Sequence, residues 1–114
     1  MALTIASREV DGVVILDLSG RITLGEGSVQ LRDAIRGLIG KGKKNILLNL
    51  GEVNYIDSSG LGELVSAFTT AKNQHAEVKL LKLTRKVHDL LQLTKLVTVF
   101  DIKDDEASAI ASFK

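Results

Sequence analysis

The stretch Asn45 to Phe68, NILLNLGEVNYIDSSGLGELVSAF, joins a strand pattern to a helix pattern and decides the fold. Asn45 to Leu50 is a short apolar run, long enough for a buried strand and short for a helix. Asp57-Ser58-Ser59-Gly60 follows as a short loop and the start of a helix, because Asp and Ser cap helix N-termini. Apolar residues then recur with the spacing of one helix face, at Leu61, Leu64, Val65 and Phe68.

The serine pair is the most chemically suggestive feature of this stretch. A hydroxyl at a helix N-terminus is exposed and lies near the positive end of the helix dipole. Simple capping by Asp57, Ser58 or Ser59 also explains these residue types, so the motif leaves both a structural and a functional interpretation open.

Outward from this stretch, strand and helix patterns alternate along the chain. Asp11-Gly12 predicts a hairpin turn, since both positions tolerate positive φ. Glycine and lysine at the end of the first helix fit a left-handed cap and the helix dipole. The predicted elements are strands at Leu3–Glu9 and Val13–Leu18, a loop at Gly20–Ser28, a helix at Val29–Ile39 ended by Gly40–Lys44, a central helix reaching Gln74, a strand at Val78–Leu83, a short helix capped by Thr84, a strand at Val97–Phe100 and a terminal helix opening with Asp104-Asp105-Glu106.

This order predicts an α/β fold, with one domain spanning residues 1–114. The sheet is expected to be mixed, with an antiparallel hairpin first and parallel strands after it, joined by right-handed crossovers. Binding sites in such folds lie beyond the carboxyl ends of the parallel strands. Asp57-Ser58 is expected there, and the Gly20 to Gly27 loop should emerge at the same end.

The composition excludes several functional classes. The 114 residues are 45% hydrophobic and 25% charged, with a formal net charge of +1 and no cysteine. This charge balance makes no case for nucleic acid or an anionic membrane as partner. The chain shows no signal peptide and no apolar run of about 20 residues, so membrane insertion is not expected. The absence of cysteine fits a reducing compartment, and we expect a cytoplasmic protein.

Four functional signatures are incomplete or missing, which argues against a cofactor, a metal or catalysis. Gly37–Lys44 lacks the Ser or Thr of a phosphate-binding P-loop and closes a helix instead of opening one. Gly60–Val65 lacks the third small residue of a dinucleotide fingerprint, so its glycines more simply allow close approach of the helix start to the sheet or to a partner. His75 and His88 have no ligand constellation around them, and neither serine has a catalytic elbow. We therefore expect no cofactor, no metal and no enzyme.

The chain resembles the STAS domain in a motif at a strand–helix junction. This motif consists of Asn49-Leu50 followed by Asp57-Ser58-Ser59-Gly60-Leu61-Gly62. It is most similar to the anti-sigma factor antagonists of bacterial partner-switching systems. The likeness extends over nearly the whole chain, from the initial hairpin through the alternating strands and helices.

The resemblance implies a function and named partners. In that family the unmodified protein binds a GHKL-type serine kinase that is also an anti-sigma factor, and so releases the sigma factor. The kinase phosphorylates the serine matching Ser58, and a PP2C-type phosphatase reverses this. The motif residues Asp57, Ser59, Gly60, Leu61 and Gly62 inherit a contact role.

The glycine loop departs from the family pattern. Relatives often carry an acid where this chain reads Gly20-Arg21-Ile22-Thr23. Arg21 and Thr23 therefore become candidate partner-binding residues that influence which kinase is recognised. We expect a monomer or a weak dimer.

Two other functions also fit the sequence. STAS-like domains also serve as scaffold subunits of sensory complexes or as regulatory subunits of transporters, and neither role requires modification of Ser58. A nucleotide-binding module using the Gly20 loop and the Gly60 turn is the other rival.

Overall fold

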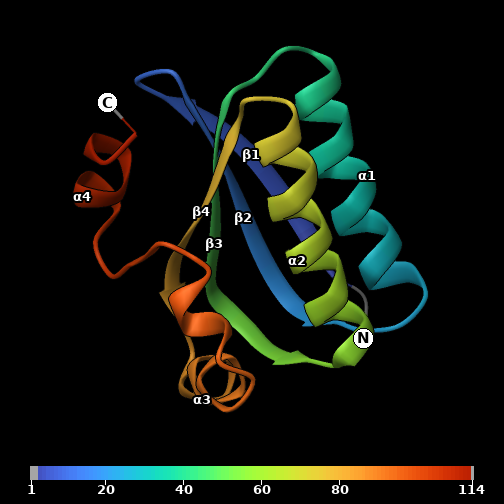
Figure 1. Cartoon of the computed structure of the whole chain (residues 1–114). Coiled ribbons are helices and arrows are strands. Elements are labelled where there is room, and N and C mark those ends of the chain that lie inside the picture. The colour runs from blue at the N-terminus through green and yellow to red at the C-terminus, as the bar shows by residue number, and fades with distance from the viewer. Residues whose placement is uncertain (1–2, 114) are drawn as a thin grey trace.

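The computed structural model describes residues 3–113 and contains one five-stranded sheet with helices on both faces (Figure 1). The strands stand in the spatial order β1-β2-β3-β4-β5. β1 pairs antiparallel with β2, and each later neighbouring pair is parallel. The elements are β1 (Thr4–Val10), β2 (Val13–Ile22), α1 (Glu26–Gly40), β3 (Asn45–Ile56), α2 (Ser58–Asn73), β4 (Glu77–Leu83), α3 (Arg85–Leu93), the 3-10 helix η1 (Leu96–Thr98), β5 (Ile102–Lys103) and α4 (Glu106–Ala111).

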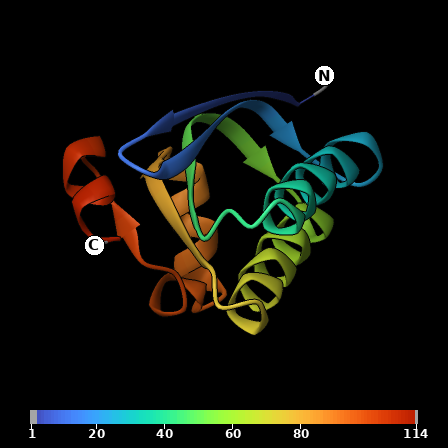
Figure 2. The same cartoon turned by 90° about the horizontal axis from the view of Figure 1, so that it is seen from above.

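The two faces of the sheet carry separate apolar clusters, because successive side chains of a strand point to opposite faces. The larger cluster lies under α1, α2 and α3 and includes Leu48 of β3 and Leu64 of α2. The smaller cluster lies under α4 and includes Leu47 of β3 and Ile110 of α4. Viewed from above, the sheet separates α1 and α2 from α4 (Figure 2). The expected mixed α/β architecture is confirmed.

Two predicted turns are confirmed in detail. Asp11 and Gly12 both have positive φ, 51° and 80°, in the turn between β1 and β2. At the end of α1, the amides of Gly42 and Lys43 donate to the carbonyls of Ile39 and Leu38, which is the Schellman pattern of a helix end. The Gly37–Lys44 segment therefore closes a helix, as expected.

Two strands run further than predicted. β2 continues to Ile22 and β3 continues to Ile56, so the short loop expected at residues 57–60 is reduced to Asp57 and the glycine loop is reduced to residues 23–25. The register between β2 and β3 shifts at two places, between Asp17 and Ser19 and between Gly20 and Arg21. These irregularities break the alternation of side chains, which is the signal that identifies a strand in a sequence.

The prediction of a strand at Val97–Phe100 is wrong. Lys95 adopts a left-handed conformation, and the amides of Val99 and Phe100 both donate to the carbonyl of Leu96, which winds this segment into a tight turn. The buried Phe100 ring meets Phe68 edge to face with centroids 5.5 Å apart. The last strand is instead Ile102–Lys103.

The terminal helix begins later than predicted. Asp105 is the N-cap of α4, and its side chain accepts a hydrogen bond from the Ser108 amide. Only Glu106 of the three acids lies in the first turn. Ala109 and Ile110 are buried and Phe113 packs against them, as predicted.

Candidate functional site

Asp57 is the N-cap of α2 and connects the end of β3 directly to this helix. Its backbone is extended, and one carboxylate oxygen accepts a hydrogen bond from the Gly60 amide at 2.8 Å. Ser58 and Ser59 are the first two residues of the helix. Capping by Asp57, one of the interpretations that the sequence left open, is therefore confirmed, and neither serine is the N-cap.

The same carboxylate also holds the neighbouring loop. The second Asp57 oxygen accepts a hydrogen bond from the Leu24 amide at 2.9 Å. The Asp57 amide in turn donates to the Ile22 carbonyl at 3.2 Å. The loop after β2 and the start of α2 thus meet at the carboxyl ends of β2 and β3, as the topology predicted.

These hydrogen bonds favour the ionised form of the Asp57 carboxyl. The amide of Gly60 first, and then the amide of Leu24, lower the pKa of the Asp57 carboxyl below its ordinary value. A negative charge near a helix N-terminus is favourable because of the helix dipole. Ser58 therefore adjoins a fixed carboxylate.

Gly60 permits this close packing. A Cβ atom at this position would overlap the Ile22 carbonyl oxygen and lie 2.8 Å from Ile22 Cγ2. Gly62 has open space around it, with no heavy atom within 4 Å of such a Cβ. Close approach of the helix start to the sheet, one of the two roles expected for these glycines, is thus confirmed for Gly60 and not for Gly62.

The motif residues differ in their exposure. Ser58 and Gly62 are exposed in the N-terminal part of α2, whereas Ser59 and Leu61 are half-buried and Gly60 is buried. Ser58 is consequently the motif hydroxyl most open to another protein.

The two loop residues singled out by sequence have different surroundings. The exposed guanidinium of Arg21 lies 4.8 Å from the centre of the Tyr55 ring. Thr23 is half-buried, and its carbonyl accepts hydrogen bonds from the amide and the hydroxyl of Ser28 at 3.0 Å and 2.8 Å. Arg21 therefore presents a side chain at the surface, while the backbone of Thr23 fixes the start of α1.

Sequence reasoning missed two apolar residues at this end of the sheet. Leu24 is 77% exposed and Tyr55 is 43% exposed. Leu24 belongs to a loop without periodicity, and Tyr55 belongs to the irregular part of β3. No pattern in the sequence marks either residue as exposed.

Within residues 3–113, no group of three or more His, Cys, Asp and Glu side chains is arranged to hold a metal ion. His75 and His88 are exposed. No helix of this part of the chain is long and apolar enough to cross a membrane.

The sequence is similar to a known protein family and to several named relatives. The STAS domain family model matches residues 4–109. The anti-sigma F factor antagonist of Paenibacillus polymyxa is 27% identical over 117 residues, which covers 100% of this chain and 97% of the relative. The anti-sigma-B factor antagonist of Bacillus subtilis is 28% identical over 102 residues, which covers 90% of this chain and 92% of the relative.

Solved structures share the fold. A crystal structure from Thermotoga maritima superposes with a TM-score of 0.87 at 27% identity, covering 95% of this chain and 92% of that one. The anti-sigma factor antagonist SpoIIAA in its unphosphorylated form superposes with a TM-score of 0.73, covering 96% of this chain and 97% of that one. The Bacillus cell fate determinant SpoIIAA in its phosphorylated form superposes with a TM-score of 0.76, covering 97% of this chain and 100% of that one. At 20% identity, these last two show a common fold.

Proposed function

This chain belongs to the STAS domain family, and we propose that it is an anti-sigma factor antagonist whose binding is switched off by phosphorylation of Ser58. The observation that carries the proposal is the exposed Ser58 at the mouth of α2, beside a carboxylate fixed by two backbone amides. The names of its relatives support the choice of partner, an anti-sigma factor. The protein acts by binding and not by catalysis.

The proposed cycle has two opposing enzymes. A serine kinase that is also the anti-sigma factor binds the unmodified chain and releases its sigma factor. The same kinase then transfers a phosphoryl group to the Ser58 hydroxyl, and a PP2C-type phosphatase removes it. The proposed contact residues around Ser58 are Asp57, Ser59, Gly60, Leu61, Gly62, Arg21 and Thr23.

Phosphorylation alters the surface far more than it alters the fold. A phosphate adds a charge of roughly −1.5 to −2. The helix dipole favours that charge and the Asp57 carboxylate opposes it, so their effects on folding partly cancel. At an interface, burying an unpaired dianion costs several kcal/mol, on the order of a thousandfold in affinity. Binding is therefore blocked locally, by charge and bulk.

The test combines the purified chain with its cognate kinase. With ATP, we expect phosphate on Ser58, identified by mass spectrometry, and none in Ser58→Ala. Isothermal titration should show that Ser58→Ala still binds the kinase and that Ser58→Asp binds it more weakly. Ser59→Ala is the matched control and should still be phosphorylated. Labelling at another residue, or no binding by the unmodified chain, would refute the proposal.

A further inference from the structure

β1 is the outer strand on the side of the sheet away from β5, and its outer edge is open. Within residues 3–113, its neighbouring strand is β2 alone, and no helix lies along its outer side (Figure 2). Its seven residues pair with β2 in one unbroken register. Most of them are exposed, namely Thr4, Ala6, Ser7, Arg8 and Glu9. A regular and exposed edge strand of this kind is a template for pairing with another strand.

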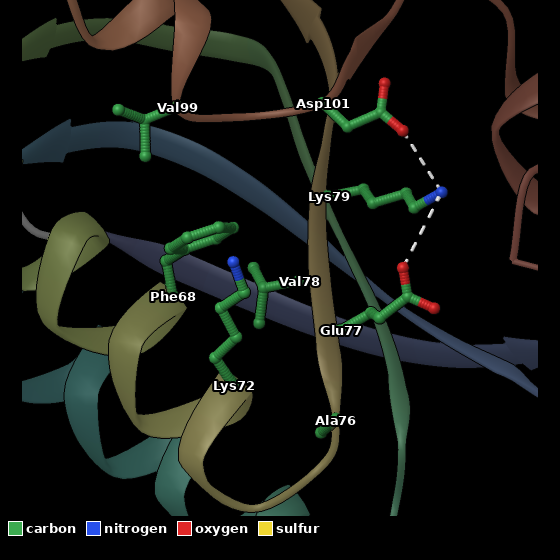
Figure 3. Close-up of a pocket in the computed structure, with 8 residues that line it drawn as sticks. All are labelled: Phe68, Lys72, Ala76, Glu77, Val78, Lys79, Val99 and Asp101. Carbon is green, nitrogen blue, oxygen red and sulfur yellow. Dashed lines mark ion pairs between the residues drawn. The ribbon is translucent and has the colours of Figure 1, made fainter.

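The opposite edge of the sheet is closed. β5 pairs with the middle of β4, and just before β5 the Asp101 carbonyl accepts a hydrogen bond from the Leu80 amide. The preceding residues of β4 are covered as well, because Val78 is 3% exposed and Lys79 is 7% exposed. The Lys79 ammonium lies between the carboxylates of Asp101, at 3.1 Å, and Glu77, at 3.9 Å (Figure 3). Pairing with a further strand is therefore expected at β1 and not at β4.

The turn between β1 and β2 determines which backbone groups of β1 face outward. Val10 and Val13 flank a two-residue turn, so they form a hydrogen-bonded pair. Hydrogen-bonded and non-hydrogen-bonded pairs alternate along an antiparallel ladder, so every second residue of β1 bonds to β2 and the residues between them face the open side. The outward groups are the amides and carbonyls of Ile5, Ser7 and Glu9, and no other segment of the described chain forms a backbone hydrogen bond with them.

The charged side chains of β1 do not protect this edge. Charges on an edge strand oppose association because pairing with another strand would remove them from water. Here Arg8 already forms ion pairs with Asp17 and Glu106, and Glu9 forms one with Lys43 at 3.1 Å. Both charges are thus compensated within their own molecule, and a second strand beside β1 leaves neither of them without a partner.

We propose that two copies of this chain associate through β1, antiparallel to each other about a two-fold axis at Ser7. The two sheets then form one continuous sheet. Ser7 exchanges both backbone hydrogen bonds with Ser7 of the second copy, and Ile5 does the same with Glu9, so all the outward groups of β1 are bonded. The interface includes none of the motif residues around Ser58, so this inference does not rest on the proposed switch.

Charge and length select this register over the adjacent ones. With the axis at Ser7, Arg8 lies opposite Ala6 of the second copy and Glu9 lies opposite Ile5, so no like charges face each other. An axis at Arg8 would set the two Arg8 side chains directly opposite each other, which is unfavourable. An axis at Ala6 would leave Glu9 beyond the end of the second β1 strand.

Sedimentation equilibrium of the full chain, combined with amide exchange measured by NMR, tests the interface. We expect a monomer–dimer equilibrium at concentrations up to about 1 mM, where even a weak interface is populated. Dimer formation should slow exchange of the Ile5, Ser7 and Glu9 amides, whereas the Ala6 and Arg8 amides already bond to β2 and should not change. A chain that stays monomeric over this range would overturn the proposal, as would a dimer in which exchange of the Ser7 amide is unchanged.

A charge exchange at Ser7 tests the position of the axis. Ser7 is exposed and lies opposite itself, so Ser7→Lys and Ser7→Glu should each dimerise several-fold more weakly than the unaltered chain. An equal mixture of the two variants should form a heterodimer. The matched control is Thr4→Lys, because exposed Thr4 lies opposite Val10 of the second copy, and it should dimerise like the unaltered chain. A mixture that associated no more strongly than either variant alone would contradict an axis at Ser7.

Discussion

At the scale of single residues, Leu24 is placed to contact a protein that binds at Ser58. Its amide is held by Asp57, and the residue is 77% exposed. Burying a leucine side chain is worth about 1.5–3 kcal/mol, so Leu24→Ser should weaken kinase binding by about tenfold or more in isothermal titration. Leu93 on α3 is 81% exposed and provides a matched control. If Leu93→Ser lowered the affinity as much as Leu24→Ser, general surface hydrophobicity and not a specific contact would be responsible.

Gly60 and Gly62 form a second pair of residues with opposite expectations. A methyl group at Gly60 would overlap the Ile22 backbone, and forced overpacking costs about 1–3 kcal/mol, so Gly60→Ala should lower the free energy of unfolding. Gly62 has open space and lies inside a helix, where alanine is favoured over glycine by about 0.5–1 kcal/mol. Gly62→Ala should therefore raise the free energy of unfolding. Urea unfolding measures both changes, and destabilisation of equal size in the two variants would show that close packing is not the reason for Gly60.

At the scale of elements, α4 depends on Lys79 for its position on the sheet. The helix has six residues, too few to be stable without tertiary contacts. The buried Lys79 ammonium donates to the Ser112 carbonyl at 2.8 Å and to the Ser112 hydroxyl at 3.0 Å, directly after the helix. Lys79→Met should cost about 1.5–3 kcal/mol of stability and accelerate amide exchange in α4.

The control for this prediction is Lys103→Met. Lys103 also approaches Asp101, at 3.4 Å, and makes no hydrogen bond to Ser112. Its replacement should leave amide exchange in α4 unchanged. Slow exchange of the Ala109 and Ile110 amides in Lys79→Met would mean that apolar packing alone holds the helix.

Elements with strong local signals were predictable, and elements set by tertiary contacts were not. Residues that are neighbours in the sequence determine the hairpin at Asp11-Gly12, the glycine end of α1 and the apolar face of α2. The strand expected at Val97–Phe100 fails because an apolar run of that length has no periodicity that separates a strand from a packed turn. The turn places Phe100 against Phe68, a contact between residues that are far apart in sequence.

At the scale of the whole molecule, the proposed switch surface combines contiguous and distant parts of the chain. Motif residues 57–62 were accessible to sequence reasoning because they are contiguous at the start of α2. Leu24 was not, since the hydrogen bond from its amide to the Asp57 carboxylate joins residues that lie 33 positions apart in the sequence.

The ion pairs that join β1, β2 and α4 should make the stability of the whole molecule sensitive to acid. Arg8 bonds both Asp17 and Glu106, and it lowers the pKa of each carboxyl below its ordinary value. A carboxyl whose pKa is lower in the folded state stabilises the protein above its unfolded pKa, about 4, and loses this contribution as the pH falls through the folded value. Because these side chains are about a third exposed, the contribution is no more than about 1 kcal/mol.

Arg8→Ala should therefore be less stable than the unaltered chain at pH 7, and the difference should shrink as the pH falls below about 4. Urea unfolding at a series of pH values measures both quantities. Arg36→Ala is the control, since exposed Arg36 forms no ion pair within residues 3–113, and its difference from the unaltered chain should not depend on pH. A difference for Arg8→Ala that stayed constant to pH 2 would show that Arg8 stabilises the fold by packing its side chain and not by its charge.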